Sequence, residues 1–169
     1  MDLVLDATPL IYLGKTGKID LLDAFDVVVP EPVYQEVVSR GLEEGHPDAR
    51  RVELGFDFGI LNRVSVGDLD TFVRLRNNPR LSVGDAAVLA VAIEHDRVAV
   101  ADDRYIRDVA GVEGIETKGM AWLVLHALRE GAMSKSDARE MIDDLVDAGW
   151  YCSTDVYARI IRRIEEIGG

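Results

Sequence analysis

The chain has 169 residues, a length that suits one domain, or one domain with an appendage, and allows a substantial hydrophobic core. Its 31 acidic and 19 basic residues give a formal net charge of −12, which excludes a general basic nucleic-acid binder and a polybasic membrane-surface protein. A single cysteine, Cys152, excludes an internal disulfide and a zinc site built from cysteines.

The N-terminus lacks a basic region and is interrupted by acids, so we expect no signal peptide. No apolar run reaches the roughly 18 residues that a membrane-spanning helix needs. These features predict a soluble, cytoplasmic protein without a membrane partner.

The first half of the chain predicts alternating strands and helices. Short apolar runs indicate buried strands at 3–5 and 27–29, and a less regular pattern predicts an edge strand at 60–66. Helical turns are predicted at 10–13, 19–25, 33–39 and 68–76. The polar, glycine-bearing stretch 41–48 is predicted to be a mobile loop.

The region from 81 to 118 continues this alternation. Residues 86–93 are apolar nearly all round and predict a central, buried helix. A strand is predicted at 98–101, a helix at 105–109 and a short strand at 115–117. Strands that are continuous apolar runs, separated by helices, indicate an α/β fold with a parallel sheet.

From Met120 onward the pattern is only helical, with three amphipathic stripes and a capping box from Ser134 to Asp137. Three apolar faces need something to cover them. We therefore expect residues 119–169 to be a helical extension packed on a domain formed by 1–118, or on a second copy of it. The size of the tail argues against a separately folded domain.

Acidic residues at particular places in this pattern are candidates for chemistry. Asp6 and Asp103 follow apolar strands at the carboxyl side, where open α/β sheets bind ligands. Asp85 lies in the first turn of the central helix, and Glu36 lies on the helix after the second strand. If the sheet brings them together, each carboxylate raises the pKa of the others. One or two Mg²⁺ or Mn²⁺ ions would remove that cost and bind a phosphodiester.

Each acid also has a structural interpretation. Asp85 forms the far half of a capping box with Ser82, and Asp6 suits a turn or an N-cap. Glu36 alone is typical of a solvated helix residue. One member of the Asp102–Asp103 doublet caps the next helix even if the other binds metal.

Other chemistries have less support. The sequence contains no phosphate-binding lysine loop, no dinucleotide-binding glycine motif and no H-E-x-x-H zinc motif. Cys152 is interpreted as a packing residue. A phosphatase with Asp6 as nucleophile is disfavoured because Thr8, rather than a second acid, follows two positions later. Arg104 and Arg107 are placed either to touch phosphate or to pair with surface acids.

In combination, these positions resemble the PIN-domain ribonucleases. Four motifs occur in the family's order across residues 2–109, namely the segments 3–11, 32–38, 82–92 and 98–104. The tail resembles the C-terminal extension of a prokaryotic PIN subgroup related to the toxins of VapBC toxin–antitoxin pairs. The resemblance implies a three-layer α/β/α domain with a mostly parallel central sheet, plus C-terminal helices.

The resemblance also implies a function: a Mg²⁺- or Mn²⁺-dependent endoribonuclease that acts on RNA, and such toxins are usually homodimers inhibited by a cognate antitoxin. Carried over by position, the catalytic metal ligands are Asp6, Glu36, Asp85 and Asp103. Thr8 would hydrogen-bond a ligand or water beside Asp6.

This sequence departs from the toxin pattern at two places. Ala101 stands where toxins often have a hydroxyl residue, and the doublet makes the fourth ligand ambiguous, so Asp102 stays a candidate beside Asp103. The alternative function is a catalytically inactive PIN-fold binding module. Convergence of the four carboxylates separates the two hypotheses.

The excess of acids also bears on RNA binding. A carboxylate pocket holding metal is compatible with phosphate, so the acidity excludes only binding of RNA by overall charge. The chain has only four lysines beside many aspartates and arginines, which favours the hypothesis of adaptation to a salt-rich cytoplasm.

Overall fold

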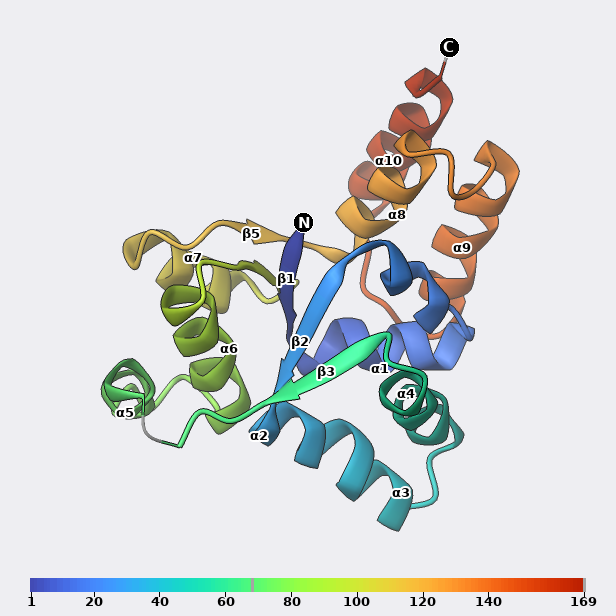
Figure 1. Cartoon of the computed structure of the whole chain (residues 1–169). Helices are drawn as coiled ribbons and strands as arrows, with labels where there is room; N and C mark the ends of the chain where they lie inside the picture. The colour runs from blue at the N-terminus through green and yellow to red at the C-terminus, as the bar shows by residue number, and fades with distance from the viewer. Residues whose placement is uncertain (68, 169) are drawn as a thin grey trace. The chain divides into compact units, whose positions relative to one another are not determined.

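The computed structural model describes residues 1–67 and 69–168. Within them, five strands form one sheet in the order β3-β2-β1-β4-β5, and every neighbouring pair is parallel (Figure 1). The strands are β1 (Asp2–Leu5), β2 (Asp26–Pro30), β3 (Leu61–Val64), β4 (Val98–Val100) and β5 (Thr117–Lys118). The predicted parallel sheet is confirmed, and β3 is the edge strand that the sequence indicates.

The central strands are continuous apolar runs because both of their faces are covered. Leu3 pairs in register with Val27 on β2 and with Val98 on β4, which places β1 in the middle of the sheet. Leu3, Val4 and Leu5 are completely buried. Parallel sheets with helices on both faces produce this pattern rather than an alternating one.

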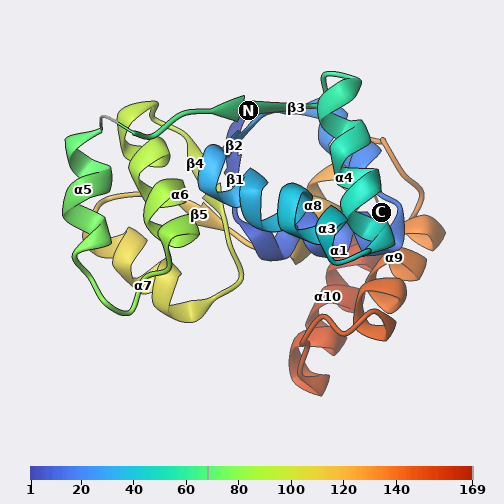
Figure 2. The ribbon, with the colours of Figure 1, turned by 90° about the horizontal axis from the view of Figure 1, so that it is seen from below.

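Helices cover both faces of the sheet, as the three-layer prediction requires. In both views α5, α6 and α7 lie to one side of the strands, and α1, α3 and α4 lie to the other (Figures 1 and 2). The helical elements are α1 (Ala7–Thr16), the 3₁₀ helix η1 (Ile19–Ala24), α2 (Glu31–Tyr34), the π-helix η2 (Gln35–Arg40), α3 (Gly41–Glu43), α4 (Pro47–Asp57), α5 (Asp70–Arg76), α6 (Val83–Glu94) and α7 (Arg104–Val112).

The central helix α6 is buried on every side, as its composition predicts: every residue from Ala86 to Ala92 is in the core. The helix predicted at 33–39 is present, but it is divided into α2 and the π-helical turn η2. The helix predicted from Asp68 is observed as α5, which starts at Asp70; Asp68 itself lies outside the described residues.

The predicted mobile loop at 41–48 is wrong. The chain continues helically from η2 into α3, and α4 begins at Pro47. Close packing explains the difference, because a Cβ on Gly41 would lie only 2.7 Å from the Cβ of Ala49 on α4. The polar composition of the segment reflects its exposed side, while its small residues allow two helical segments to meet.

The described chain separates into two compact units, Met1–Lys118 and Gly119–Gly169. The second unit contains α8 (Met120–Arg129), α9 (Lys135–Asp147) and α10 (Thr154–Glu166), which pack against one another. The capping box that begins α9 is present, with the Ser134 hydroxyl accepting from the Asp137 backbone at 3.1 Å. Packing of this extension on the α/β domain stays a prediction. No helix in the described residues is long and apolar enough to cross a membrane.

Candidate active site

Asp6 occupies the position in this fold where a ligand is expected. It follows β1 directly and is the N-cap residue of α1. Its backbone N–H donates to the Val100 carbonyl at 3.1 Å, which fixes it between the carboxyl ends of β1 and β4. The order of the sheet reverses at β1, and such switch points are where open parallel sheets bind ligands.

The Asp6 carboxyl is only 6 % exposed, and it is the one charged side chain in the buried core of the described residues. Burial raises its pKa from an ordinary 3.8 to about 7. A hydrogen bond from the Ala7 backbone opposes this increase, while the charges of Asp85, Glu36 and Asp103 raise the pKa further. The three other predicted acids therefore act electrostatically on the same buried carboxyl.

Glu36 reaches this region from the π-helical turn η2. A Cβ placed on Gly84 would lie 3.4 Å from Glu36 Oε2, so the glutamate carboxylate lies against the first turn of α6. A groove of about 490 Å³ is lined by Glu36, Arg40 and residues 82–84. Glu36 thus shares a solvent-accessible space with the start of the helix that carries Asp85.

Asp85 and Asp103 have the capping roles that the sequence allows. Asp85 Oδ2 accepts from the Ser82 backbone at 3.0 Å, and the Ser82 hydroxyl accepts from the Asp85 backbone at 3.0 Å. Asp103 is the N-cap of α7, and its Oδ1 accepts from the Ile106 backbone at 3.1 Å. These bonds orient both side chains and leave the second oxygen of each carboxylate without a hydrogen bond in the described structure.

The remaining predicted positions differ in their surroundings. Thr8 is exposed on the first turn of α1, two residues from Asp6. Asp102 is half-buried and already interacts with other groups, and Asp103 is the member of the doublet whose charge acts on Asp6. Ala101 is buried. Burial also raises the pKa of the Cys152 thiol, which agrees with its interpretation as a packing residue.

The donor atoms fit a hard divalent cation, because all four candidate side chains offer carboxylate oxygens. The charges of the three other acids disfavour ionisation of Asp6, and a bound cation would remove that penalty. In their present rotamers, however, no three His, Cys, Asp or Glu side chains of residues 1–67 and 69–168 are close enough together to hold one ion. The side chains would have to turn toward a shared ion in order to bind it.

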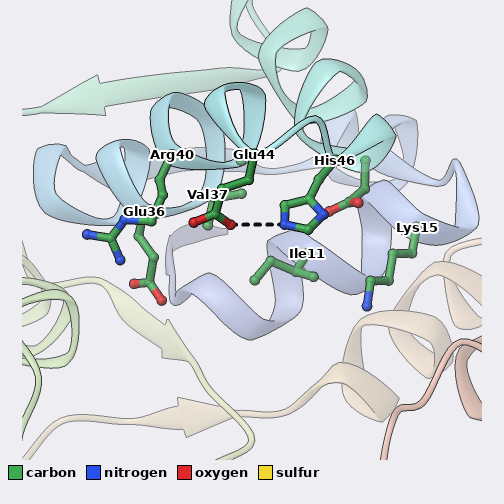
Figure 3. Close-up of a pocket in the computed structure, with 9 residues that line it drawn as sticks. Ile11, Lys15, Glu36, Val37, Arg40, Glu44 and His46 are labelled. Carbon is green, nitrogen blue, oxygen red and sulfur yellow. Dashed lines mark hydrogen bonds and ion pairs between the residues drawn. The ribbon is translucent and has the colours of Figure 1, made fainter.

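Sequence reasoning missed a second groove, of about 360 Å³, that begins at Glu36 and crosses α1, η2 and the start of α4 (Figure 3). Arg40 lies beside Glu36 at one end, and Lys15 lies at the other. His46 Nε2 and Glu44 Oε2 are 3.0 Å apart between them. The four-residue spacing of Glu36 and Arg40, which places both on one side of a helix, could have indicated this groove. The wrong prediction of a loop at 41–48 hid the helical segments that form it.

A family model described as a PIN domain (DUF3368) matches residues 2–166 of the chain. No curated protein matches it in sequence.

Solved structures of low sequence identity share its fold. VapBC2 from Rickettsia felis, in a crystal with a DNA fragment from its promoter, matches with a TM-score of 0.54 at 11% identity, over 70% of this chain and 98% of that chain. PAE2754 from Pyrobaculum aerophilum matches with a TM-score of 0.52 at 18% identity, over 73% and 96%. A PilT N-terminus domain protein from Sulfolobus solfataricus matches with a TM-score of 0.51 at 16% identity, over 76% and 94%.

Proposed function

Because the chain belongs to the PIN-domain family, whose members are generally nucleases, we propose that it is a metal-dependent endoribonuclease that hydrolyses RNA phosphodiester bonds. The proposed catalytic and metal-binding residues are Asp6, Glu36, Asp85 and Asp103. One observation carries the proposal: the carboxyl at the switch point of a parallel sheet has a pKa raised chiefly by burial and further by the charges of three acids from other elements.

The proposed cofactor is Mg²⁺ or Mn²⁺, one or two ions per site. When bound, such an ion would activate water and stabilise negative charge on the phosphate. Asp6 would be the fixed ligand, because its backbone is tied to β4. Asp85 and Asp103 would contribute the carboxylate oxygens that their helix caps leave free. Glu36 would approach from η2, and Thr8 would hydrogen-bond a ligand or water beside Asp6.

The biological role that we propose is that of a toxin-like component of a toxin–antitoxin pair in the cytoplasm. The likeness of its fold to VapBC2 supports this role. It implies a cognate antitoxin as protein partner and a homodimer as the assembly.

Cleavage of a mixed RNA pool tests the proposed activity. Wild-type protein, shown by mass spectrometry to be free of co-purifying protein, is incubated with RNA and Mn²⁺. We expect metal-dependent fragments that EDTA abolishes. Asp6→Asn and Asp85→Asn should each reduce the rate at least about a hundredfold, since each removes a proposed metal ligand. Asp108→Asn, which changes an exposed acid on α7, is the matched control and should cleave like wild type.

Two outcomes would contradict the proposal. Equal cleavage by wild type, Asp6→Asn and Asp85→Asn would assign the activity to a contaminant or another site. Absence of cleavage with either metal would favour the second candidate, an inactive PIN-fold binding module. The capping bonds of Asp85 and Asp103 are the observation that favours that candidate, because they give both carboxylates a structural role that needs no metal.

A further inference from the structure

The groove that runs from Glu36 to Lys15 is bordered by two cationic side chains that make no ion pair. Arg40 and Lys15 are both exposed, and the described structure gives neither of them a carboxylate partner. Lys15 Nζ instead lies 5.4 Å from the centre of the Tyr12 ring. Both cationic groups are therefore available to a ligand that enters the groove.

The backbone of η2 places Arg40 next to the proposed active site. A π-helical turn has about one more residue per turn than an α-helix and occurs frequently at functional sites. Residues four apart, such as Glu36 and Arg40, therefore come close to alignment along η2. Both residues line the two grooves that meet at Glu36, and Figure 3 shows their side chains next to each other. A ligand that passes Glu36 in either direction also passes the Arg40 guanidinium.

The groove has the size and polarity for a segment of one nucleic-acid strand. Its volume of about 360 Å³ lies at the low end of small-ligand pockets, roughly 300–1,000 Å³. Its acids are Glu36, which is a proposed metal ligand, Glu44, which is engaged with His46, and Asp48. Its cations are at its two ends. Guanidinium and ammonium groups are the side chains that bind phosphate oxygens.

From this arrangement we propose that the groove is the exit path of the RNA strand from the active site. Arg40 binds the backbone phosphate next to the scissile one, and Lys15 binds a phosphate farther along. This inference rests on the proposed ribonuclease function and names the residues that orient its substrate. It would let a protein with a net charge of −12 contact RNA through two cations, with Glu36 holding the proposed metal and Glu44 engaged with His46.

Salt-dependent binding tests this path separately from cleavage. An unstructured, fluorescently labelled 20-nucleotide RNA is titrated with protein in the Asp6→Asn background, which keeps the RNA intact, at several KCl concentrations. Arg40→Gln should weaken binding about tenfold and Lys15→Gln about threefold. Each should make the negative slope of log K against log salt concentration shallower by about 0.7, the value for one phosphate contact on a single strand.

Matched controls are Arg76→Gln and Lys18→Gln, which remove the same charges from exposed positions outside the groove. They should bind like the parent protein. In the active protein, Arg40→Gln should raise KM for the RNA more than it lowers kcat. Circular dichroism of each variant checks that it is folded.

The outcomes separate the two proposals. Metal-dependent cleavage by wild type, together with Arg40→Gln and Lys15→Gln slopes equal to those of the controls, would overturn the exit path and leave the ribonuclease proposal standing. Absence of both RNA cleavage and RNA binding would overturn both. A shallower salt dependence of RNA binding in Arg40→Gln and Lys15→Gln, with no change in the two controls, supports the proposed RNA path.

Discussion

The backbone of Asp6 is fixed by its hydrogen bond to Val100 on β4, and burial in the core keeps water away from its carboxyl. Its pKa is raised to about 7, so between the unfolded value near 3.8 and pH 7 the folded state binds an additional proton. The ionised carboxyl therefore reduces folding stability as pH rises through this range, and the full penalty is present above pH 7. A residue kept at such a cost at a sheet switch point is typical of a functional site rather than a packing one.

Asp6→Asn should therefore stabilise the metal-free protein at alkaline pH. In EDTA, urea unfolding should give the variant an advantage of up to about 4 kcal/mol at pH 8, since an amide carries no charge to bury. The advantage should fall below about 1 kcal/mol at pH 4, close to the unfolded pKa of 3.8, and vanish near pH 2, where Asp6 is protonated in both states. Asp108→Asn should show no such trend. An advantage that stays constant between pH 4 and pH 8 would be inconsistent with the raised pKa.

Gly84 provides a second test at the scale of one residue. An added Cβ would be in ordinary contact with Glu36 Oε2 at 3.4 Å and with Val33 Cγ2 at 3.5 Å. Alanine favours the helix by up to about 1 kcal/mol over glycine. We expect Gly84→Ala to keep or raise the melting temperature and to lower RNA cleavage roughly tenfold, because the methyl group occupies the space beside α6 that Glu36 would need in order to turn toward a shared ion.

The control for this change is Gly111→Ala on α7, where an added Cβ meets no atom within 4 Å. It should alter neither cleavage nor ligand binding. If Gly84→Ala cleaved RNA at the wild-type rate, the carboxylate of Glu36 would not need the space beside α6.

At the scale of elements, the start of α6 combines a helix cap with a proposed metal ligand. Ser82→Ala removes the hydroxyl that accepts from the Asp85 backbone, and should cost about 1 kcal/mol of unfolding free energy with cleavage retained below the melting temperature. Asp85→Asn keeps an oxygen that can accept from the Ser82 backbone, and should lose cleavage with a smaller loss of stability.

The equivalent box at the start of α9 provides the comparison: Ser134→Ala should destabilise by a similar amount without affecting cleavage. The prediction concerns the ratio of the two effects, measured by thermal unfolding and by initial rates. Parallel losses of stability and rate in Ser82→Ala and Asp85→Asn would mean that Asp85 acts only as a cap.

The elements also show where sequence reasoning succeeds. Strands β1, β2 and β4 were predictable because burial on both faces requires uninterrupted apolar runs. Helix α4 was not predicted, because its contacts use small residues such as Ala49 and the close approach of Gly41, which produce a weak apolar pattern. The π-helical turn has no composition signal of its own.

The same difference applies to the site. The acids at strand and helix ends were predictable because topology brings such ends together, and their action on Asp6 agrees with this expectation. The groove between Arg40 and Lys15 was not, because it exists only once α4 is placed beside α1. The sequence therefore predicts the site residues whose positions depend on the sheet, but not those whose positions depend on the packing of helices against one another.

At the scale of the whole molecule, the net charge of −12 affects stability as well as RNA binding. Like charges repel in the compact state, and salt screens them: the Debye length falls from about 30 Å at 0.01 M to about 8 Å at 0.15 M ionic strength. Surface pairs such as Arg74–Glu113 and Arg97–Asp26 use bases that are already counted in this net charge, so they leave the excess of acids uncompensated. The unpaired remainder destabilises the fold most strongly in dilute buffer.

We therefore expect the melting temperature to rise by several degrees between 0.01 and 0.5 M KCl in EDTA at pH 8, which corresponds to about 1 kcal/mol for a domain of this size. Choline chloride at equal ionic strength separates general screening from a specific need for potassium, since both salts screen alike. Equal increases in both salts would assign the effect to repulsion between surface acids, and a larger increase in KCl would support adaptation to a salt-rich cytoplasm. A melting temperature that does not change with either salt would show that the excess acids are too dispersed to destabilise the fold, and the sequence-based argument for salt adaptation would fail with it.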